Sequence, residues 1–314
     1  DDWTEIDAVE LVGVSLNGLS QDEIDAAAAS ASTSTSSSSS SSTSTSTVSV
    51  PDGPIGEPIY CDGNLVAENG VVVTVVQMRP NSNYTATVIG LNGFDPILAV
   101  RDADSGDGLC NDDNPDASYY SANLPTTGPV EPSRLTSSQT FNTFNYSNMA
   151  NIELVVGGYN SQPGEFVLIL EGMLLSQADG AGDPLSLGIT PGMVLSGVNP
   201  SVYMFSVVQS MDPLIALIDS DYNFIVDGDG ATVYCDDAGN ASSCWGESSN
   251  LRNSFISRTE GRTLSGINTD AMLTLPIDVD SIGFAYTPIM RSFEMRTFGD
   301  YVVAFHVGIG AREE

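Results

Sequence analysis

The sequence contains no lysine and only one histidine, and its cationic side chains are nine arginines. Forty-one aspartates and glutamates give it a formal net charge of −32. Such a surface repels phosphate groups, which argues against nucleic acid as a partner. It also disfavours docking on anionic lipid. The compatible partners are divalent cations, carbohydrate and other copies of the chain.

Long apolar runs and catalytic motifs are also missing. No stretch of about 18 apolar residues occurs, so we expect no membrane span. There is no GxSxG, HExxH or glycine-rich phosphate loop, and the one candidate base, His306, lies in an apolar segment that predicts a strand. The sequence therefore favours a non-catalytic protein.

Cysteine is scarce, and no two cysteines form a CxxC pair. With one histidine in the chain, a zinc site is not expected. The chain begins with Asp1 rather than Met, which we interpret as a mature product after removal of a signal segment, placed outside the cell or on its surface. In that setting four cysteines predict two disulfides, with three pairings open. They are Cys61, Cys110, Cys235 and Cys244.

Residues 32–47 consist of serine and threonine only. The tract has no apolar side chain to offset the entropy of ordering, so residues 31–50 are predicted to be a spacer that carries O-linked glycans. Fully extended, the tract reaches roughly 50 Å. The expected O-linked sites include Ser32, Thr33, Thr35, Thr43, Thr45 and Thr47, and N-glycosylation sequons occur at Asn83, Asn145 and Asn240.

The first 30 residues are predicted to be an assembly segment. A capping-box pattern at Ser20 and Glu23 favours a short helix over 21–29. Residues 5–16 read EIDAVELVGVSL, which predicts an extended segment with apolar side chains on both faces. Such a segment should be buried on both faces by other strands. It either folds back as an edge strand of its own domain or inserts into a neighbouring copy, and we favour the second. The side chains expected to dock are Trp3, Ile6, Val9, Leu11, Val12, Val14 and Leu16.

The rest of the chain has the sequence pattern of a β-sandwich, in which short apolar segments are separated by Gly, Pro, Asn and Asp. We expect an all-β fold of two tandem jelly-roll-like sandwiches, residues 51–178 and 179–314, divided near 176–183. The candidate strands are 70–77, 84–91, 97–101, 152–159 and 165–171, then 192–196, 203–209, 214–219, 271–276, 281–286 and 300–308.

The two halves match each other along their length, which is an internal repeat. Tyr84-Thr-Ala-Thr-Val matches Tyr203-Met-Phe-Ser-Val, and Phe94-Asp95-Pro96-Ile97 matches Met211-Asp212-Pro213-Leu214. Further on, Cys110-Asn-Asp-Asp matches Cys235-Asp-Asp, and Gly164-Glu-Phe-Val matches Gly299-Asp-Tyr-Val. The repeat favours the disulfide pairs Cys61–Cys110 and Cys235–Cys244.

This order of motifs resembles the bacterial pre-peptidase C-terminal domain, a secreted β-sandwich. The resemblance covers most of residues 54–308 as two copies. The cysteines beside both Asp-Asp pairs and the long insertions in the second copy depart from the family pattern. The resemblance implies a jelly-roll-like fold and a role in adhesion or sugar contact, without catalysis, because no peptidase accompanies the domains here.

Acidic residues gather in one loop region of each repeat. Calcium takes six to eight oxygen ligands in irregular geometry, so such loops are candidate Ca²⁺ sites. The other interpretation is that these are turns in which Asp accepts hydrogen bonds from nearby backbone. The candidate ligands are Asp102, Asp104, Asp107, Asp112 and Asp113, then Asp219, Asp221, Asp236 and Asp237.

Together these patterns predict an exported structural subunit that donates its N-terminal strand to the next copy and forms an open head-to-tail filament with a glycosylated, acidic exterior. The alternative is a monomeric secreted module that binds carbohydrate in a calcium-dependent way.

Overall fold

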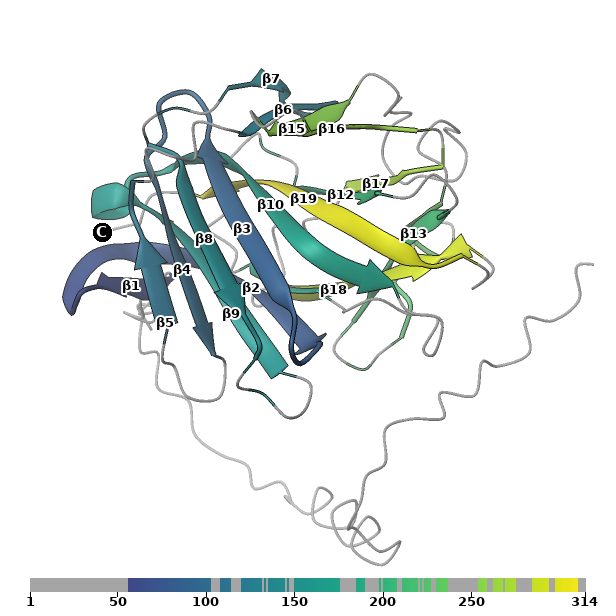
Figure 1. Ribbon diagram of the computed structural model, residues 1–314, viewed down its shortest axis with the longest axis horizontal. Coiled ribbons are helices and arrows are strands. Elements are labelled where there is room, and N and C mark those ends of the chain that lie inside the picture. Colours follow the sequence, from purple (N-terminus) through teal and green to yellow (C-terminus); the bar gives the residue numbers. More distant parts are fainter. Residues whose placement is uncertain are drawn as a thin grey trace, which may run out of the picture. The chain divides into compact units, whose positions relative to one another are not determined.

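A computed structural model describes the body of the chain (Figure 1). The described residues are 56–102, 108–113, 120–131, 133, 135–144, 146, 150–175, 185–189, 198, 200–207, 211–219, 221, 223–226, 230–236, 254–258, 262–267, 269–274, 284–293 and 297–309. They belong to the unit Gly53–Glu314, one of two units into which the chain divides. The predicted assembly segment 1–30, the linker 31–50 and the boundary near 176–183 lie outside the described residues.

The described residues are almost all in β-strands, and the only helix among them, the 3-10 turn η2 (Tyr159–Ser161), is far too short to cross a membrane. The first ten strands are β1 (Glu57–Cys61), β2 (Asn64–Met78), β3 (Asn83–Gly90), β4 (Pro96–Asp102), β5 (Gly108–Asn111), β6 (Tyr120–Leu124), β7 (Gly128–Val130), β8 (Ser137–Asn142), β9 (Ala150–Gly158) and β10 (Gly164–Leu175). The others are β11 (Leu185–Ile189), β12 (Ser201–Ser206), β13 (Pro213–Ile218), β14 (Tyr234–Cys235), β15 (Phe255–Arg258), β16 (Arg262–Ser265), β17 (Ala271–Thr274), β18 (Phe284–Ser292) and β19 (Gly299–Ile309).

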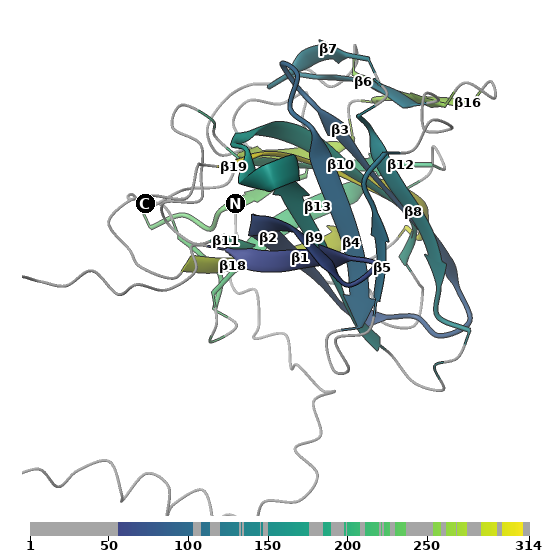
Figure 2. The same ribbon diagram turned by 90° about the vertical axis from the view of Figure 1, so that its left-hand side faces the viewer.

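The strands form three sheets (Figures 1 and 2). A nine-stranded sheet has the order β14-β13-β18-β11-β2-β9-β4-β5, with β1 also paired to β2. A six-stranded sheet has the order β17-β12-β19-β10-β3-β8, and a four-stranded sheet has the order β16-β15-β6-β7. The predicted class, an all-β sandwich, is confirmed. Ten of the eleven candidate strands overlap an observed strand, and the eleventh, 192–196, lies outside the described residues.

Strands β10, β12 and β19 of the six-stranded sheet are largely buried on both faces, which explains their nearly continuous apolar sequences. Along β10, Phe166 and Leu168 face the nine-stranded sheet and belong to the main core. Val167 and Ile169 face the other way, into a second apolar cluster shared with Leu124 and other residues of the four-stranded sheet. The six-stranded sheet is therefore the middle layer of three.

The internal repeat is visible in the topology of all three sheets. In the six-stranded sheet β10-β3-β8 is mirrored by β19-β12-β17, and in the nine-stranded sheet β2-β9-β4-β5 is mirrored by β11-β18-β13-β14. In the four-stranded sheet β6-β7 is mirrored by β15-β16. Every sheet therefore has an approximate two-fold relation between the halves of the chain.

The tandem arrangement of two sandwiches is not confirmed. The halves are joined within each sheet, because β10 pairs with β19, β11 pairs with β2, and β15 pairs with β6. One apolar core contains residues of both halves, among them Leu168 and Phe305. In the described part of the chain the two repeats thus share the same three sheets and one main core.

The structural register of the repeat differs from the register in the sequence comparison. The backbone N–H of Leu91 donates to the carbonyl of Glu165, and the N–H of Val207 donates to the carbonyl of Asp300 in the same way. Leu91 and Val207 therefore occupy equivalent positions in the two repeats. By this register, Tyr84 is not the counterpart of Tyr203. Tyr84 lies in the main core and Tyr203 in the second cluster. Two strand sequences with alternating apolar residues can be aligned with each other at more than one register. The sequence alone therefore could not decide which residues of the two repeats are equivalent.

A hairpin of β1 and the start of β2 covers the outward side of the nine-stranded sheet in the first repeat. Its two-residue turn, Asp62-Gly63, has φ values of 51° and 80°, as a type I′ turn requires. Ile59 and Ala67 pack from this hairpin onto the sheet. The predicted Cys61–Cys110 disulfide is present and ties β1 to β5.

Candidate functional site

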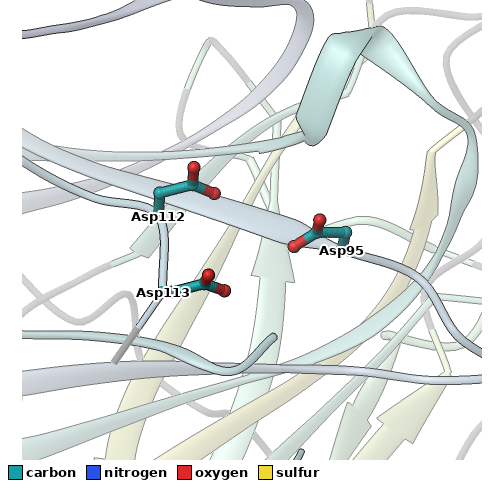
Figure 3. Close-up of side chains that lie close together, drawn as sticks. All are labelled: Asp95, Asp112 and Asp113. Carbon is teal, nitrogen blue, oxygen red and sulfur yellow. The ribbon is translucent and has the colours of Figure 1, made fainter. Parts of the chain in front are cut away.

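Three carboxylates meet at one end of the β4–β5 hairpin (Figure 3). They belong to Asp95, Asp112 and Asp113, and one oxygen of each lies within 4.8 Å of the others. Asp95 immediately precedes β4, and the other two immediately follow β5. Because Leu98 pairs with Asn111 in antiparallel register, the start of one strand lies beside the end of the other. We call these three residues the acidic triad.

Backbone contacts fix the loops that carry the acidic triad. The N–H of Tyr159 donates to the carbonyl of Asp95 at 2.8 Å. The hydroxyl of Ser137 donates to the carbonyls of Pro96 and Asp112, which joins β8 to both loops. The amide of Asn111 donates to the carbonyl of Asp113 at 3.4 Å. The carboxylate positions thus follow from the hairpin and its neighbouring strand.

The electrostatics of the acidic triad favour a bound cation or a proton. Burial, followed by the charges of Asp112 and Asp113, raises the pKa of Asp95 above its usual value. Burial and the charge of Asp113 also raise the pKa of Asp112. The Oδ1 atom of Asp95 is buried and has no hydrogen-bond partner. Three converging oxygens of this kind suit a hard cation such as Ca²⁺, and further ligands would come from carbonyls or water.

Of the predicted calcium ligands that the structure describes, only Asp112 and Asp113 are brought together. Asp102 lies at the far end of β4, where it accepts a hydrogen bond from the hydroxyl of Tyr146. Asp104, Asp107 and Asp237 lie outside the described residues.

Asp219 behaves as the turn interpretation expects. Its carboxylate accepts the backbone N–H groups of Asp221 and Asn223, each at 2.9 Å. These bonds, led by the one from Asn223, lower the pKa of Asp219. Asp219 therefore caps a local turn, and Asp221 is an exposed residue of the same turn.

The prediction missed Asp95, although the sequence held a signal for it. Asp95-Pro96 and Asp212-Pro213 occupy equivalent positions before β4 and β13, and an Asp-Asp pair follows the partner strand in each repeat. Antiparallel pairing of the two strands would have placed these motifs together. In the second repeat the equivalent residues are Asp212, Asp236 and Asp237, the last of which is not described.

The cysteines of the two repeats are not equivalent. Cys110 pairs with Ala99 on the outward side of the nine-stranded sheet, whereas Cys235 pairs with Ile215 and lies in the main core. The pairing of β4 with β5 and of β13 with β14 therefore makes Asn111, rather than Cys110, the counterpart of Cys235 in the first repeat. Cys244 lies outside the described residues, so the Cys235–Cys244 pair stays a prediction.

Among the predicted glycosylation sites, only Asn83 is described. It is exposed at the start of β3, where an attached glycan has room. Asn145, Asn240 and the Ser/Thr tract, Ser32, Thr33, Thr35, Thr43, Thr45 and Thr47 included, lie outside the described residues. So do all the predicted docking residues of the N-terminal strand.

Comparison with known proteins finds no protein-family model that matches this chain. No curated protein matches its sequence either.

Proposed function

We propose that this protein is a non-catalytic, extracellular structural subunit that builds an open filament by donating its N-terminal strand to the next copy. The observation that carries the proposal is the apolar segment 5–16, which the Ser/Thr tract separates from the body in the sequence. A segment with apolar side chains on both faces is stabilised when another part of a protein buries both faces. The Ser/Thr tract is long enough for the segment to reach another subunit.

The arrangement of the body supports this proposal. All described residues belong to the unit Gly53–Glu314, while the segment belongs to the unit Asp1–Asp52. The six-stranded sheet ends in β17 and β8, and edge strands are the usual template for pairing with another chain. Head-to-tail donation gives a contact that does not close, which produces a filament. Glycans on the tract and the net negative charge would form its exterior.

Deletion of residues 1–19 tests strand donation. We expect the truncated protein to stay monomeric in size-exclusion chromatography and negative-stain microscopy, while the full chain forms filaments. Leu11→Asp in the full chain should have the same effect, because it puts a charge on a docking side chain. Asn17→Asp, which adds the same charge just past the strand, should polymerise normally. Filaments of normal yield from the deletion variant or from Leu11→Asp would refute the proposal.

The second candidate is a monomeric adhesion module that binds carbohydrate with the help of calcium. The acidic triad, with the buried and unpartnered Oδ1 of Asp95, favours this candidate. The resemblance of the repeats to pre-peptidase C-terminal domains supports the same role. Native material that is monomeric, and that loses thermal stability in a chelator, would favour this module over the filament subunit.

A further inference from the structure

The four-stranded sheet is an outer layer that two arms of the chain form together (Figure 1). One arm is β6 and β7, which lie between β5 and β8 in the chain, and the other is β15 and β16, which lie between β14 and β17. The arms pair with each other through β6 and β15. In the described part of the chain no strand pairing joins this layer to the six-stranded middle sheet. Side-chain contacts therefore hold the layer on that sheet.

The apolar part of this contact is much smaller than the main core. The buried apolar side chains that the outer layer supplies to the second cluster are Ala122, Leu124, Val130 and Ile256. The main core, by contrast, takes residues from most strands of the six- and nine-stranded sheets. Because apolar stabilisation grows with the area buried, lifting the outer layer costs less than separating the other two sheets.

The polar part of the contact converges on Thr126, in the turn between β6 and β7. Its N–H donates to the phenol oxygen of Tyr203 at 3.3 Å, and its Oγ1 lies 2.6 Å from the same oxygen. Oγ1 also lies 2.9 Å from Nδ1 of His306. Tyr203 on β12 and His306 on β19 are both buried. One threonine of an arm is thus hydrogen-bonded to two strands of the middle sheet.

The hydrogen bonds around Thr126 have a definite direction when His306 is neutral. Nε2 of the ring is buried, has no hydrogen-bond partner and lies 3.7 Å from Oε2 of Glu165. A carboxylate on this side favours the tautomer with its hydrogen on Nε2, which leaves Nδ1 as an acceptor. The hydroxyl of Thr126 then donates to Nδ1 and accepts the hydroxyl of Tyr203.

A second proton on the ring has to bind Nδ1, where it meets the hydroxyl hydrogen of Thr126. The threonine must then turn its hydroxyl toward Tyr203, whose phenol loses the acceptor it had. The His306 ring, only 5% exposed, also carries a positive charge between two apolar layers.

Glu165 offsets this charge only in part. Among the described residues it is the only charged group within ion-pair distance of His306, and Tyr203 is the other titratable group in the contact. Burial lowers the pKa of His306, and the carboxylate of Glu165 opposes the shift. The protonated ring is therefore better accommodated where water can reach it.

We infer that protonation of His306 loosens the contact of the outer layer with the middle sheet, so that in acid this layer opens while the main core stays closed. Opening admits water to the imidazolium and breaks few apolar contacts. It uncovers the apolar face of the middle sheet that carries Val167, Ile169, Phe205 and Val302. The fold thus contains an acid-sensitive latch. The inference concerns the body of one chain and is independent of strand donation.

Thiol labelling tests this latch in the full chain. Ala304→Cys puts a reporter on the middle sheet within the second cluster, and Ala86→Cys puts one on the same sheet within the main core. Both alanines are fully buried. Labelling by iodoacetamide is measured without reductant at pH 7 and pH 5, relative to the same variant unfolded in urea, so that thiol ionisation cancels. The chain with its native cysteines alone is the blank.

The relative labelling at position 304 should rise about fivefold or more from pH 7 to pH 5, because an open state that binds one extra proton gains up to about tenfold per pH unit. Labelling at position 86 should change less than about twofold. Adding His306→Asn, which has no titrating ring, should cut the rise at position 304 to less than about twofold. Adding Glu165→Gln should leave the rise as steep or make it steeper.

An equal rise at positions 86 and 304 would indicate global unfolding and overturn the inference. So would a constant labelling rate at position 304, or a rise there that persists with His306→Asn. A smaller rise with Glu165→Gln would contradict the role of that carboxylate. If Ala304→Cys does not fold, Ala122→Cys on β6 reports from the other side of the same contact, with the same expected rise.

Discussion

Nδ1 of His306 lies 2.9 Å from Oγ1 of Thr126, across 180 residues of sequence. His306 is on β19 of the middle sheet, and Thr126 is in the turn between β6 and β7 of the four-stranded sheet. The same threonine hydroxyl lies 2.6 Å from the hydroxyl of Tyr203. Glu165 is the only charged group within ion-pair distance in the described part of the chain, with its Oε2 3.7 Å from Nε2 of His306. These groups form a polar contact that holds two layers together inside an apolar interface.

His306 should make stability depend on pH in a defined direction. Burial lowers its pKa below 6.5, and Glu165 opposes this effect only partly. The unfolded state therefore binds the proton more readily, and the free energy of unfolding falls as pH drops below about 6.5. Thermal unfolding between pH 7.5 and 5.5 should show a larger loss of Tm for the wild type than for His306→Asn.

Tyr203→Phe is the control for this prediction, because it removes the phenol from the same contact. Burial raises the pKa of Tyr203 to about 12, so the phenol does not titrate in this range. Its variant should keep the pH dependence of the wild type. Equal pH dependence in the wild type and His306→Asn would contradict the assignment. Acids with raised pKa values, such as Asp270, act with the opposite sign but are present in all variants.

The Cys61–Cys110 bond should stabilise the first-repeat cover. The cysteines are 49 residues apart, and replacing both with alanine should lower the free energy of unfolding by about 2–4 kcal/mol. Urea unfolding followed by circular dichroism measures this. Tyr60→Ser, an exposed change on the same strand, is the matched control and should cost less than about 0.5 kcal/mol. Unfolding of the double alanine variant at wild-type urea concentration would show that the hairpin does not depend on the bond.

Asp270 should be among the costliest polar side chains to remove. It is fully buried and accepts the N–H and hydroxyl of Ser206 and the N–H of Ile267, at 2.9, 3.0 and 2.8 Å. Asp270→Ala leaves these donors unpaired, at a cost of about 3 kcal/mol or more. Thr136 caps the equivalent turn of the first repeat with one bond, from the N–H of Ser133, so Thr136→Ala should cost about 1 kcal/mol. Equal losses would contradict this ranking.

Calcium binding should depend on Asp95. Calorimetric titration of the wild type should show one Ca²⁺ site that Asp95→Asn abolishes and Asp221→Asn leaves intact. Because the pKa values of Asp95 and Asp112 are raised, protons compete with the ion at higher pH than at an ordinary aspartate, and affinity should rise with pH above about 4. Identical titrations of wild type and Asp95→Asn would exclude the acidic triad as the site.

Strands with strong apolar content were predictable from sequence, and the short or polar ones were not. β10 and β19 are long apolar runs, whereas β5 has four residues and β8 reads SSQTFN. Such segments become strands because a neighbouring strand offers partners for their backbone, which propensity does not reveal. The same limit hid Asp95, whose place beside Asp112 depends on the pairing of β4 with β5.

By itself, the sequence determined the all-β class, the presence of an internal repeat, the Cys61–Cys110 pair and the strongly acidic character. These follow from local patterns and composition, which need no knowledge of distant contacts. Only the tertiary structure decided that both repeats share three sheets, that Tyr84 and Tyr203 face different clusters, and that Asp95 completes the acidic triad. Each of these depends on strand register and on pairing between distant segments, and a shift of one residue turns every side chain of a strand to the opposite face.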